Sequence, residues 1–387
     1  MGSPTLMKVS IIAALGSVLS LTLANFVTFH PNRIVAGKPF SIFESAGFAG
    51  AIPLILMLAT ILYAALSKSR GKWRWYVLGA LPSIATALLF FTAGQAATRL
   101  SLEASPIVRV SLGGGFWIPL LLLPVILIDA IQNMGDWKLP SAAGLLSAIF
   151  VAILFASGFM DDLSLMKEYA NRADRFIAEL ITHLALSSTA VTLAVLIGAP
   201  LGLLAQRRER LSGPTFFTLN VLQTIPSLAL FSILIPLIAA LTVLFPALKN
   251  AGIGAIGSTP ALIALTIYSI LPVARNTYTG LRAVDSAMVE AARGMGMTPG
   301  QRLIKVELPI ASPIILGGVR IALVQAVGLT AVAALIGAGG LGTFIFLGIG
   351  QSADDLILLG ALPTVLVALA ADGAMQGLIK IVKPKGI

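Results

Sequence analysis

The residues with the clearest capacity for chemistry lie in one polar stretch, residues 285–309, between two long apolar segments. Glu290 and Arg293 supply charges of opposite sign among small residues, so the stretch offers a surface for recognition rather than a reactive group. The chain has no cysteine, and neither His30 nor His183 has a second histidine at ligand spacing. We therefore expect no catalytic residue and no metal site in this chain.

A short helix followed by a break is expected at the start of this stretch. Residues 286–292 have types that favour a helix. Gly294 and Gly296 are expected to stop this helix, because glycine readily adopts a positive φ.

A second helix is expected to begin at Thr298. With Thr298 at the N-cap and Gln301 at N3, the sequence predicts a capping box, and Pro299 occupies the N1 position that proline favours. Pro309 is expected to end this helix, because proline removes a backbone donor and clashes with the preceding turn. The whole stretch would then project as a compact helical element that suits a groove on a partner protein.

This helical element resembles the EAA loop in the permease subunits of ATP-binding-cassette (ABC) importers. That loop reads E-A-A, three residues, G, nine residues and then I-x-L-P, and only Val306, in place of isoleucine, departs from it. In that family the loop is the coupling helix, which fits a cleft in the cytoplasmic ATPase. The residues to which the resemblance assigns this coupling are Glu290, Ala291, Ala292, Arg293, Gly296 and Pro309. The alternative is an ordinary amphipathic loop with a chance E-A-A.

The elements that position this loop are expected to be membrane helices. The 387-residue chain is 57% hydrophobic and 11% charged, with a mean hydropathy of +0.97, which is too apolar for a soluble domain. A helix needs about 20 apolar residues to cross the hydrocarbon. Ten segments qualify, at about 8–29, 47–66, 76–98, 114–132, 141–159, 184–205, 215–243, 260–277, 313–336 and 356–379. The sequence therefore predicts an all-α polytopic membrane protein, because helices satisfy their own backbone groups in lipid.

Four basic clusters set the expected orientation. They comprise Lys68, Arg70, Lys72 and Arg74; Arg207, Arg208 and Arg210; Arg282, Arg293, Arg302 and Lys305; and Lys380, Lys383 and Lys385. With ten spans and both termini inside, all four clusters lie in the cytoplasm, in agreement with the positive-inside rule. We therefore expect a multi-pass protein of the bacterial inner membrane. These clusters also account for the net charge of +10, so nucleic-acid binding is not expected.

A polar connector is expected to divide the chain. Residues 161–183 form the longest polar stretch on the outer side, between an N-terminal membrane region of about five helices at 1–160 and a permease core at 184–387. The core places the loop of residues 280–310 between its third and fourth spans. This layout resembles the five-span core of type I importer permeases, and the resemblance covers about residues 180–380.

A second motif points to the solute. Residues 221–230 look like the Gln-Thr-Ile-Pro-Ser signature of osmoprotectant permeases, and the glycine-rich residues 336–342 are similar to an outer loop of the same group. These permeases import glycine betaine, choline, carnitine or related quaternary amines. Proline removes a backbone hydrogen bond and can kink a span, as broken helices in transport paths do. The expected pathway residues are Gln223, Thr224, Pro226 and Ser227. The alternative is a structural kink whose polar side chains bond neighbouring helices.

ATP hydrolysis is not expected in this chain itself. No G-x-x-x-x-G-K-[ST] sequence occurs, so the energy must come from another subunit. The resemblance implies a cytoplasmic ABC ATPase that carries the ATP, an extracytoplasmic solute-binding protein, and a second permease that is either an identical copy or a homologous subunit. No cofactor is expected on this chain. GxGxxG strings at 252–257 and 337–342 follow no strand, so dinucleotide binding is rejected.

The sequence leaves two other functions open. One is import of another small solute, such as an amino acid, and the other is ion-coupled secondary transport. An ion-coupled transporter is expected to hold ionisable residues deep in the bilayer. The spans of the C-terminal half contain Arg320 and Asp372, which are expected to pair or to extend toward the cytoplasmic end. Structural pairing favours the ATP-driven importer.

Overall fold

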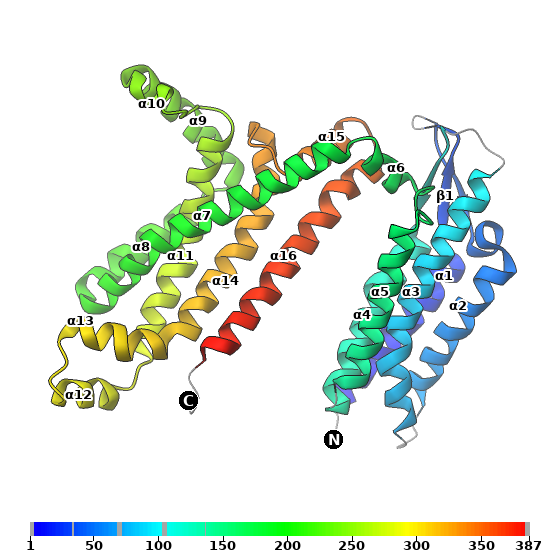
Figure 1. Ribbon diagram of the computed structural model, residues 1–387, viewed down its shortest axis with the longest axis horizontal. Helices are drawn as coiled ribbons and strands as arrows, with labels where there is room; N and C mark the ends of the chain where they lie inside the picture. The colour runs from blue at the N-terminus through cyan, green and yellow to red at the C-terminus, as the bar shows by residue number, and fades with distance from the viewer. Residues whose placement is uncertain (1–3, 33–34, 68–71, 103–106, 136, 384–387) are drawn as a thin grey trace. The chain divides into compact units, whose positions relative to one another are not determined.

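A computed structural model describes residues 4–32, 35–67, 72–102, 107–135 and 137–383 of the chain (Figure 1). The chain divides into two compact units, Met1–Asn171 and Arg172–Ile387. Among the described residues, nine helices are long and apolar enough to cross a membrane, and a further helix contains the shorter apolar stretch Val9–Leu23. The prediction of a helical polytopic membrane protein is therefore confirmed. Lys68, Arg70 and Lys385 of the predicted basic clusters lie outside the described residues.

The first unit is a helical bundle with a small sheet at one end (Figure 1). Its helices are α1 (Pro4–Leu23), α2 (Ile42–Leu66), α3 (Trp73–Ser101), α4 (Gly114–Met134), α5 (Lys138–Ala156) and the short α6 (Ser164–Ala170). The strands β1 (Val27–His30), β2 (Lys38–Phe40) and β3 (Arg109–Leu112) form an antiparallel sheet in the order β2-β1-β3.

One predicted membrane span is shorter than expected, because its last residues form a strand of the sheet. The segment expected to cross the membrane at 8–29 ends its helix at Leu23, and β1 begins four residues later at Val27. The reason is tertiary pairing, because Val27 lies opposite Phe40 on one side and Leu112 on the other. Apolar and β-branched residues that fit a helix in lipid also fit a sheet when partner strands are available.

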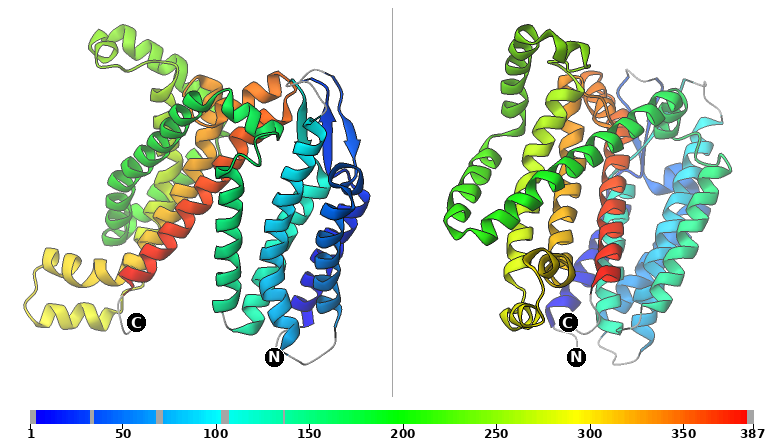
Figure 2. Two further views of the ribbon diagram at one scale, coloured as in Figure 1. Left: turned by 45° about the vertical axis from the view of Figure 1, so that its right-hand side comes forward. Right: turned by 60° about the vertical axis from the view of Figure 1, so that its left-hand side comes forward.

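The second unit contains the predicted core. Its long helices are α7 (Ala173–Arg207), α8 (Glu209–Thr224), α9 (Ser227–Leu244), α11 (Ser258–Arg282), α14 (Leu308–Ala333) and α16 (Asp354–Val382). The shorter ones are α10 (Pro246–Asn250), α12 (Ser286–Gly294), α13 (Pro299–Arg302), a π-helical turn at Leu303–Glu307, a 3₁₀ turn at Ala334–Ile336 and α15 (Gly342–Gly350). Within this unit α12 and α13 project from the end opposite α10 (Figure 2).

Glycines allow α11 to pack closely against α7 and α14. A Cβ atom added at Gly198 of α7 would lie 3.0 Å from the Ile270 carbonyl oxygen of α11. A Cβ atom added at Gly318 of α14 would lie 2.6 Å from the Pro272 carbonyl oxygen of the same helix, α11. No side chain fits between these backbones, which is the usual way that membrane helices approach closely. The α7, α11 and α14 layer therefore forms the centre of the second unit.

Neighbouring glycines of α14 provide a matched test of this packing. We expect Gly318→Ala to destabilise the purified chain by about 1–3 kcal/mol, because the methyl group would overlap the α11 backbone. Gly317→Ala is the control, since nothing lies within 4 Å of its added Cβ and alanine favours a helix. Thermal unfolding in detergent measures both, and equal melting temperatures for the two variants would contradict the packing argument.

Candidate coupling loop and solute-pathway site

The predicted first helix of the loop is α12, and its ends are capped. The Asp285 carboxylate accepts a hydrogen bond from the Ala287 N–H at 2.9 Å at the N-terminus. At the C-terminus the Met297 N–H bonds the Ala292 carbonyl at 3.2 Å in a Schellman arrangement, and Gly296 adopts a φ of +79°. The expectation for Gly296 is confirmed. Gly294 is the last residue of α12 but does not adopt a positive φ, so Gly296 alone provides the left-handed residue that ends the helix.

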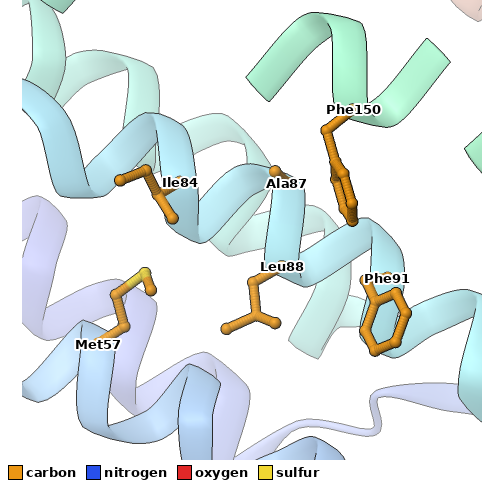
Figure 3. Close-up of a pocket in the computed structure, with 6 residues that line it drawn as sticks. All are labelled: Met57, Ile84, Ala87, Leu88, Phe91 and Phe150. Atoms are coloured by element: carbon orange, nitrogen blue, oxygen red, sulfur yellow. The ribbon is translucent and has the colours of Figure 1, made fainter. Parts of the chain in front are cut away.

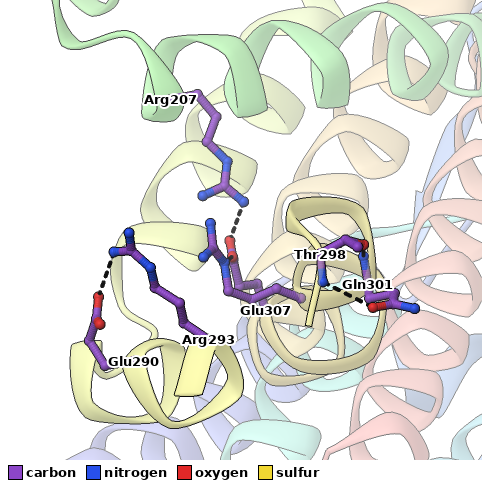
Figure 4. A network of polar contacts seen from close by, with 7 residues as sticks. Arg207, Glu290, Arg293, Thr298, Gln301 and Glu307 are labelled. Atoms are coloured by element: carbon purple, nitrogen blue, oxygen red, sulfur yellow. Dashed lines mark hydrogen bonds and ion pairs between the residues drawn. The ribbon is translucent and has the colours of Figure 1, made fainter. Parts of the chain in front are cut away.

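The predicted second helix begins as expected but does not end as expected. Thr298 and Gln301 form the reciprocal capping box, with the Thr298 N–H donating to the Gln301 side chain at 2.9 Å (Figure 4). The prediction that Pro309 ends this helix is wrong, because the chain continues through the π turn into α14. In that turn the Leu308 N–H bonds the Leu303 carbonyl five residues back. The wider turn accommodates a proline at the start of α14, where its missing N–H costs no α-helical bond.

The loop exposes most, but not all, of the predicted coupling residues. The Glu290 and Arg293 side chains are 67% and 71% exposed and form an ion pair at 3.8 Å (Figure 4). Ala291, Gly296 and Pro309 are also exposed. Ala292 is only 1% exposed, so it packs toward the rest of the unit and offers no surface to a partner in this arrangement.

Exposed apolar side chains accompany these charges and were missed from the sequence. Met288 is 42% exposed and Met295 is 71% exposed, and both lie on or beside α12. Together with Ala291 they follow an i, i+3, i+7 spacing, which places them on one face of a helix. That spacing could have indicated an apolar docking face.

A buried carboxylate at the base of the loop was also missed. Glu307, in the π turn, is 2% exposed and contacts Arg207 of α7 at 2.5 Å (Figure 4). It also contacts Arg302 of α13 at 3.1 Å. It occupies the variable position of the V-x-L-P ending, so the motif did not single it out. The ion pair brings together residues that lie 100 positions apart.

The predicted pathway residues lie at a break between two helices. The span expected at 215–243 is not one kinked helix, because α8 ends at Thr224 and α9 begins at Ser227. Pro226 is the N-cap of α9, and its carbonyl accepts a bond from the Leu230 N–H at 3.0 Å. The proline removes a donor at this point, so the two helices separate completely.

Polar groups at this break bond the neighbouring helix α11. The Gln223 side chain donates to the Tyr268 carbonyl at 2.7 Å, and the Tyr268 hydroxyl donates to the Ile225 carbonyl. Thr224 bonds within its own helix, to the Val221 carbonyl at 2.7 Å. These bonds agree with the structural alternative for Gln223. They also hold the carbonyl-rich break in a fixed position.

The glycine-rich segment is a turn bonded to α7. Gly337, Gly339 and Gly340 have φ values of +76°, +79° and +86°. The Glu179 carboxylate accepts the Gly340 N–H at 2.6 Å. The nearby His183 ring, which is fully buried, lies 3.3 Å from the Leu341 N–H.

The ionisable pair within the spans of the second unit is formed as expected. Arg320 of α14 binds Asp372 of α16 through two hydrogen bonds, one of them at 2.9 Å. Gln376 donates a further bond to Asp372 at 2.7 Å. The carboxylate thus has a cation and a neutral donor, which is the arrangement of a structural pair.

The first unit contains an apolar cavity of about 430 Å³ (Figure 3). Its lining is Met57, Ile84, Ala87, Leu88, Phe91 and Phe150. None of these side chains carries a hydrogen-bonding group or a charge, so the cavity has no means of recognising a polar solute.

Sequence models of two protein families match the chain. The N-terminal domain of the ABC transporter permease YehY matches residues 6–166. The binding-protein-dependent transport system inner membrane component matches residues 191–385, about half of the chain. The chain belongs to this second family. The resemblance inferred from the EAA loop is thereby confirmed, and the protein is a multi-pass inner-membrane permease of an ABC importer.

Individual relatives each match about half of the chain. The osmoprotectant import permease protein OsmW of Salmonella typhimurium is 43% identical over 205 residues, which cover 53% of this chain and 90% of OsmW. The choline transport system permease protein OpuBB of Bacillus subtilis is 36% identical over 205 residues, which cover 53% of this chain and 87% of OpuBB. A solved structure of the MetNI methionine ABC transporter in an inward-facing conformation is 26% identical, covers 54% of this chain and 96% of its own, and has a TM-score of 0.46.

The capping box gives a test of the loop as a preformed element. Thr298→Ala is expected to remove about 1 kcal/mol of local stability, because one backbone donor of α13 loses its acceptor. That loss corresponds to about five-fold faster hydrogen exchange of the α13 amides in the purified permease. Thr298→Ser keeps the hydroxyl and serves as the control. Identical exchange in the two variants would show that the box does not order the loop.

Proposed function

We propose that this permease imports osmoprotectants of the quaternary-amine class, such as glycine betaine or choline, with energy from a separate ATPase. The support is the similarity of about half of the chain to OsmW and OpuBB together with the Gln-Thr-Ile-Pro-Ser sequence at residues 223–227. A quaternary ammonium ion has no hydrogen-bond donors, so it suits carbonyl dipoles and aromatic faces better than a fixed anion. The break between α8 and α9 interrupts the helical bonding within a predicted span, and we assign Gln223, Thr224, Pro226 and Ser227 to the pathway on that basis.

The coupling role rests on the shape of the loop. Its tip combines exposed charge at Glu290 and Arg293 with exposed apolar surface at Met288 and Met295, while its base is held by buried Glu307. An exposed surface that combines methionine side chains with arginine is typical of a protein-docking site. We propose that Glu290, Ala291, Arg293, Gly296 and Pro309, which are exposed, contact a cytoplasmic ABC ATPase, with buried Ala292 supporting them from within the fold.

The remaining partners and the orientation follow from the same assignment. A loop that docks to an ATPase lies in the cytoplasm, which places both termini there if all ten predicted spans cross the membrane. An extracytoplasmic binding protein would deliver the solute, and a second permease, identical or homologous, would complete the pathway. The N-terminal region at 1–160 and the connector at 161–183 are proposed as an addition to the transport core at 184–387.

Solute uptake tests the substrate class. The permease, its ATPase subunit and its binding protein, reconstituted in vesicles, are expected to accumulate radiolabelled glycine betaine or choline in the presence of ATP. The same vesicles with a neutral amino acid provide the comparison. Accumulation of the amino acid without either quaternary amine would assign the permease to another solute class.

Coupling is tested at the left-handed glycine of the loop. Gly296→Asp is expected to lower ATP-dependent uptake at least about ten-fold, since a side chain at a φ of +79° is strained and adds a negative charge to the docking face. Gly213→Asp on α8 is the control, because Gly213 is exposed, has nothing within 4 Å of an added Cβ and lies outside the loop. Undiminished uptake by the Gly296 variant would refute the docking role of the loop.

A further inference from the structure

The base of the coupling loop inverts the usual placement of charged and apolar side chains. Ile304 is 66% exposed, whereas Glu307, three residues later in the same π turn, is 2% exposed. Burying a carboxylate is unfavourable unless cations and hydrogen bonds compensate it. The arrangement therefore depends on the partners that Glu307 has, and these come from two different helices.

Each oxygen of the Glu307 carboxylate receives one arginine. The Arg207 Nη2 atom lies 2.5 Å from Oε2 (Figure 4). The Arg302 Nε atom lies 3.1 Å from Oε1. Arg302 is the last residue of α13 and belongs to the loop, whereas Arg207 is the last residue of α7. Glu307 thus joins the loop to a helix that is not its neighbour in the sequence.

The π turn determines that Glu307 is the residue in this position. One additional residue per turn changes which side chains face inward, compared with a continuous α-helix. In this turn Lys305 and Ile304 face outward and Glu307 faces the arginines. π turns are frequent at functional sites, where the loss of helical regularity is tolerated for the sake of side-chain placement.

At its other end, α7 is bonded to the glycine-rich turn. Glu179, near the start of α7, accepts the Gly340 N–H at 2.6 Å, and the His183 ring accepts the Leu341 N–H at 3.3 Å. One helix of 35 residues, about 50 Å long, therefore connects the coupling loop with the glycine-rich turn at the opposite end of the second unit.

We propose that Glu307 is a positioning residue that fastens the coupling loop to α7, so that a displacement of the loop moves α7 together with α14. This role rests on the proposed docking of the loop to an ATPase. Without the bond to Arg207, the loop would act on the core through its covalent connections to α11 and α14 and through an apolar cluster. That cluster is formed by Leu281, Val284 and Ala311, and Leu203 of α7 packs against it together with Val289 and Leu303 of the loop. With it, the same displacement reaches the glycine-rich turn through α7.

The experiment measures how much solute is imported for each ATP hydrolysed. The complete complex of permease, ATPase and binding protein is reconstituted with Glu307→Gln, with Arg207→Gln and with both changes. We expect each single variant to retain ATP hydrolysis and to import about ten-fold less solute per ATP, the order of a typical coupling free energy. The double variant is expected to be no worse than either single one, because both changes remove the same contact.

Arg208→Gln is the matched control for the loss of positive charge. Arg208 follows Arg207 directly and is exposed, and the described part of the chain shows no ion pair for it. It is expected to keep the solute-to-ATP ratio of the unmodified permease. A role limited to stability would lower the yield of assembled complex or its melting temperature but would leave that ratio unchanged in the complexes that form.

Three results would overturn the proposal. One is an unchanged ratio in Glu307→Gln, and another is a double variant whose defect multiplies those of the single variants. If Glu307→Gln does not assemble, Arg207→Gln decides, since the Arg207 side chain is 36% exposed and its removal leaves Glu307 paired with Arg302. An unchanged ratio in that variant is the third result. Loss of coupling in Gly296→Asp without loss in these variants would refute the fastening alone and leave the docking role intact.

Discussion

Backbone groups in a membrane cannot rely on water, and this constraint governs where the helices of the permease can be interrupted. At the break between α8 and α9, the Ile225 carbonyl accepts the hydroxyl proton of Tyr268 from α11. At the glycine-rich turn, the Gly340 N–H donates to Glu179 of α7. Where α13 passes into α14, the π turn bonds its own backbone. The first two interruptions therefore come with a partner from another helix, and those partners tie the second unit together.

The features that could be predicted from the sequence are those that neighbouring residues determine. The capping box at Thr298 and Gln301 depends on residues three apart, and it forms as predicted. The membrane helices depend on the length and apolarity of each segment, which composition reveals directly. The pairing of Arg320 with Asp372 was also predicted, although these residues lie 52 positions apart. It could be predicted because charged side chains inside membrane spans have few alternatives to pairing.

The features that could not be predicted depend on partners far along the chain. Residues 27–30 form a strand because β2 and β3 lie on either side, which no local pattern indicates. Pro309 fails to end its helix because a π turn precedes it, and the inward position of Glu307 requires an arginine 100 residues earlier. In the family pattern this glutamate stands at a variable position. A motif identifies a docking loop but gives no information about what holds it.

Met288 in α12 and Met295 just after it make the tip of the coupling loop adaptable, whereas the base of the loop is rigid. A methionine side chain has three rotatable bonds and a polarizable sulfur, so it keeps contact with surfaces of changing shape. Met288 and Met295 thus offer a pliable contact, whereas the buried carboxylate below them admits little variation in geometry. The tip of the loop can therefore keep contact with a partner surface that changes shape, while the paired carboxylate keeps the base of the loop in one geometry.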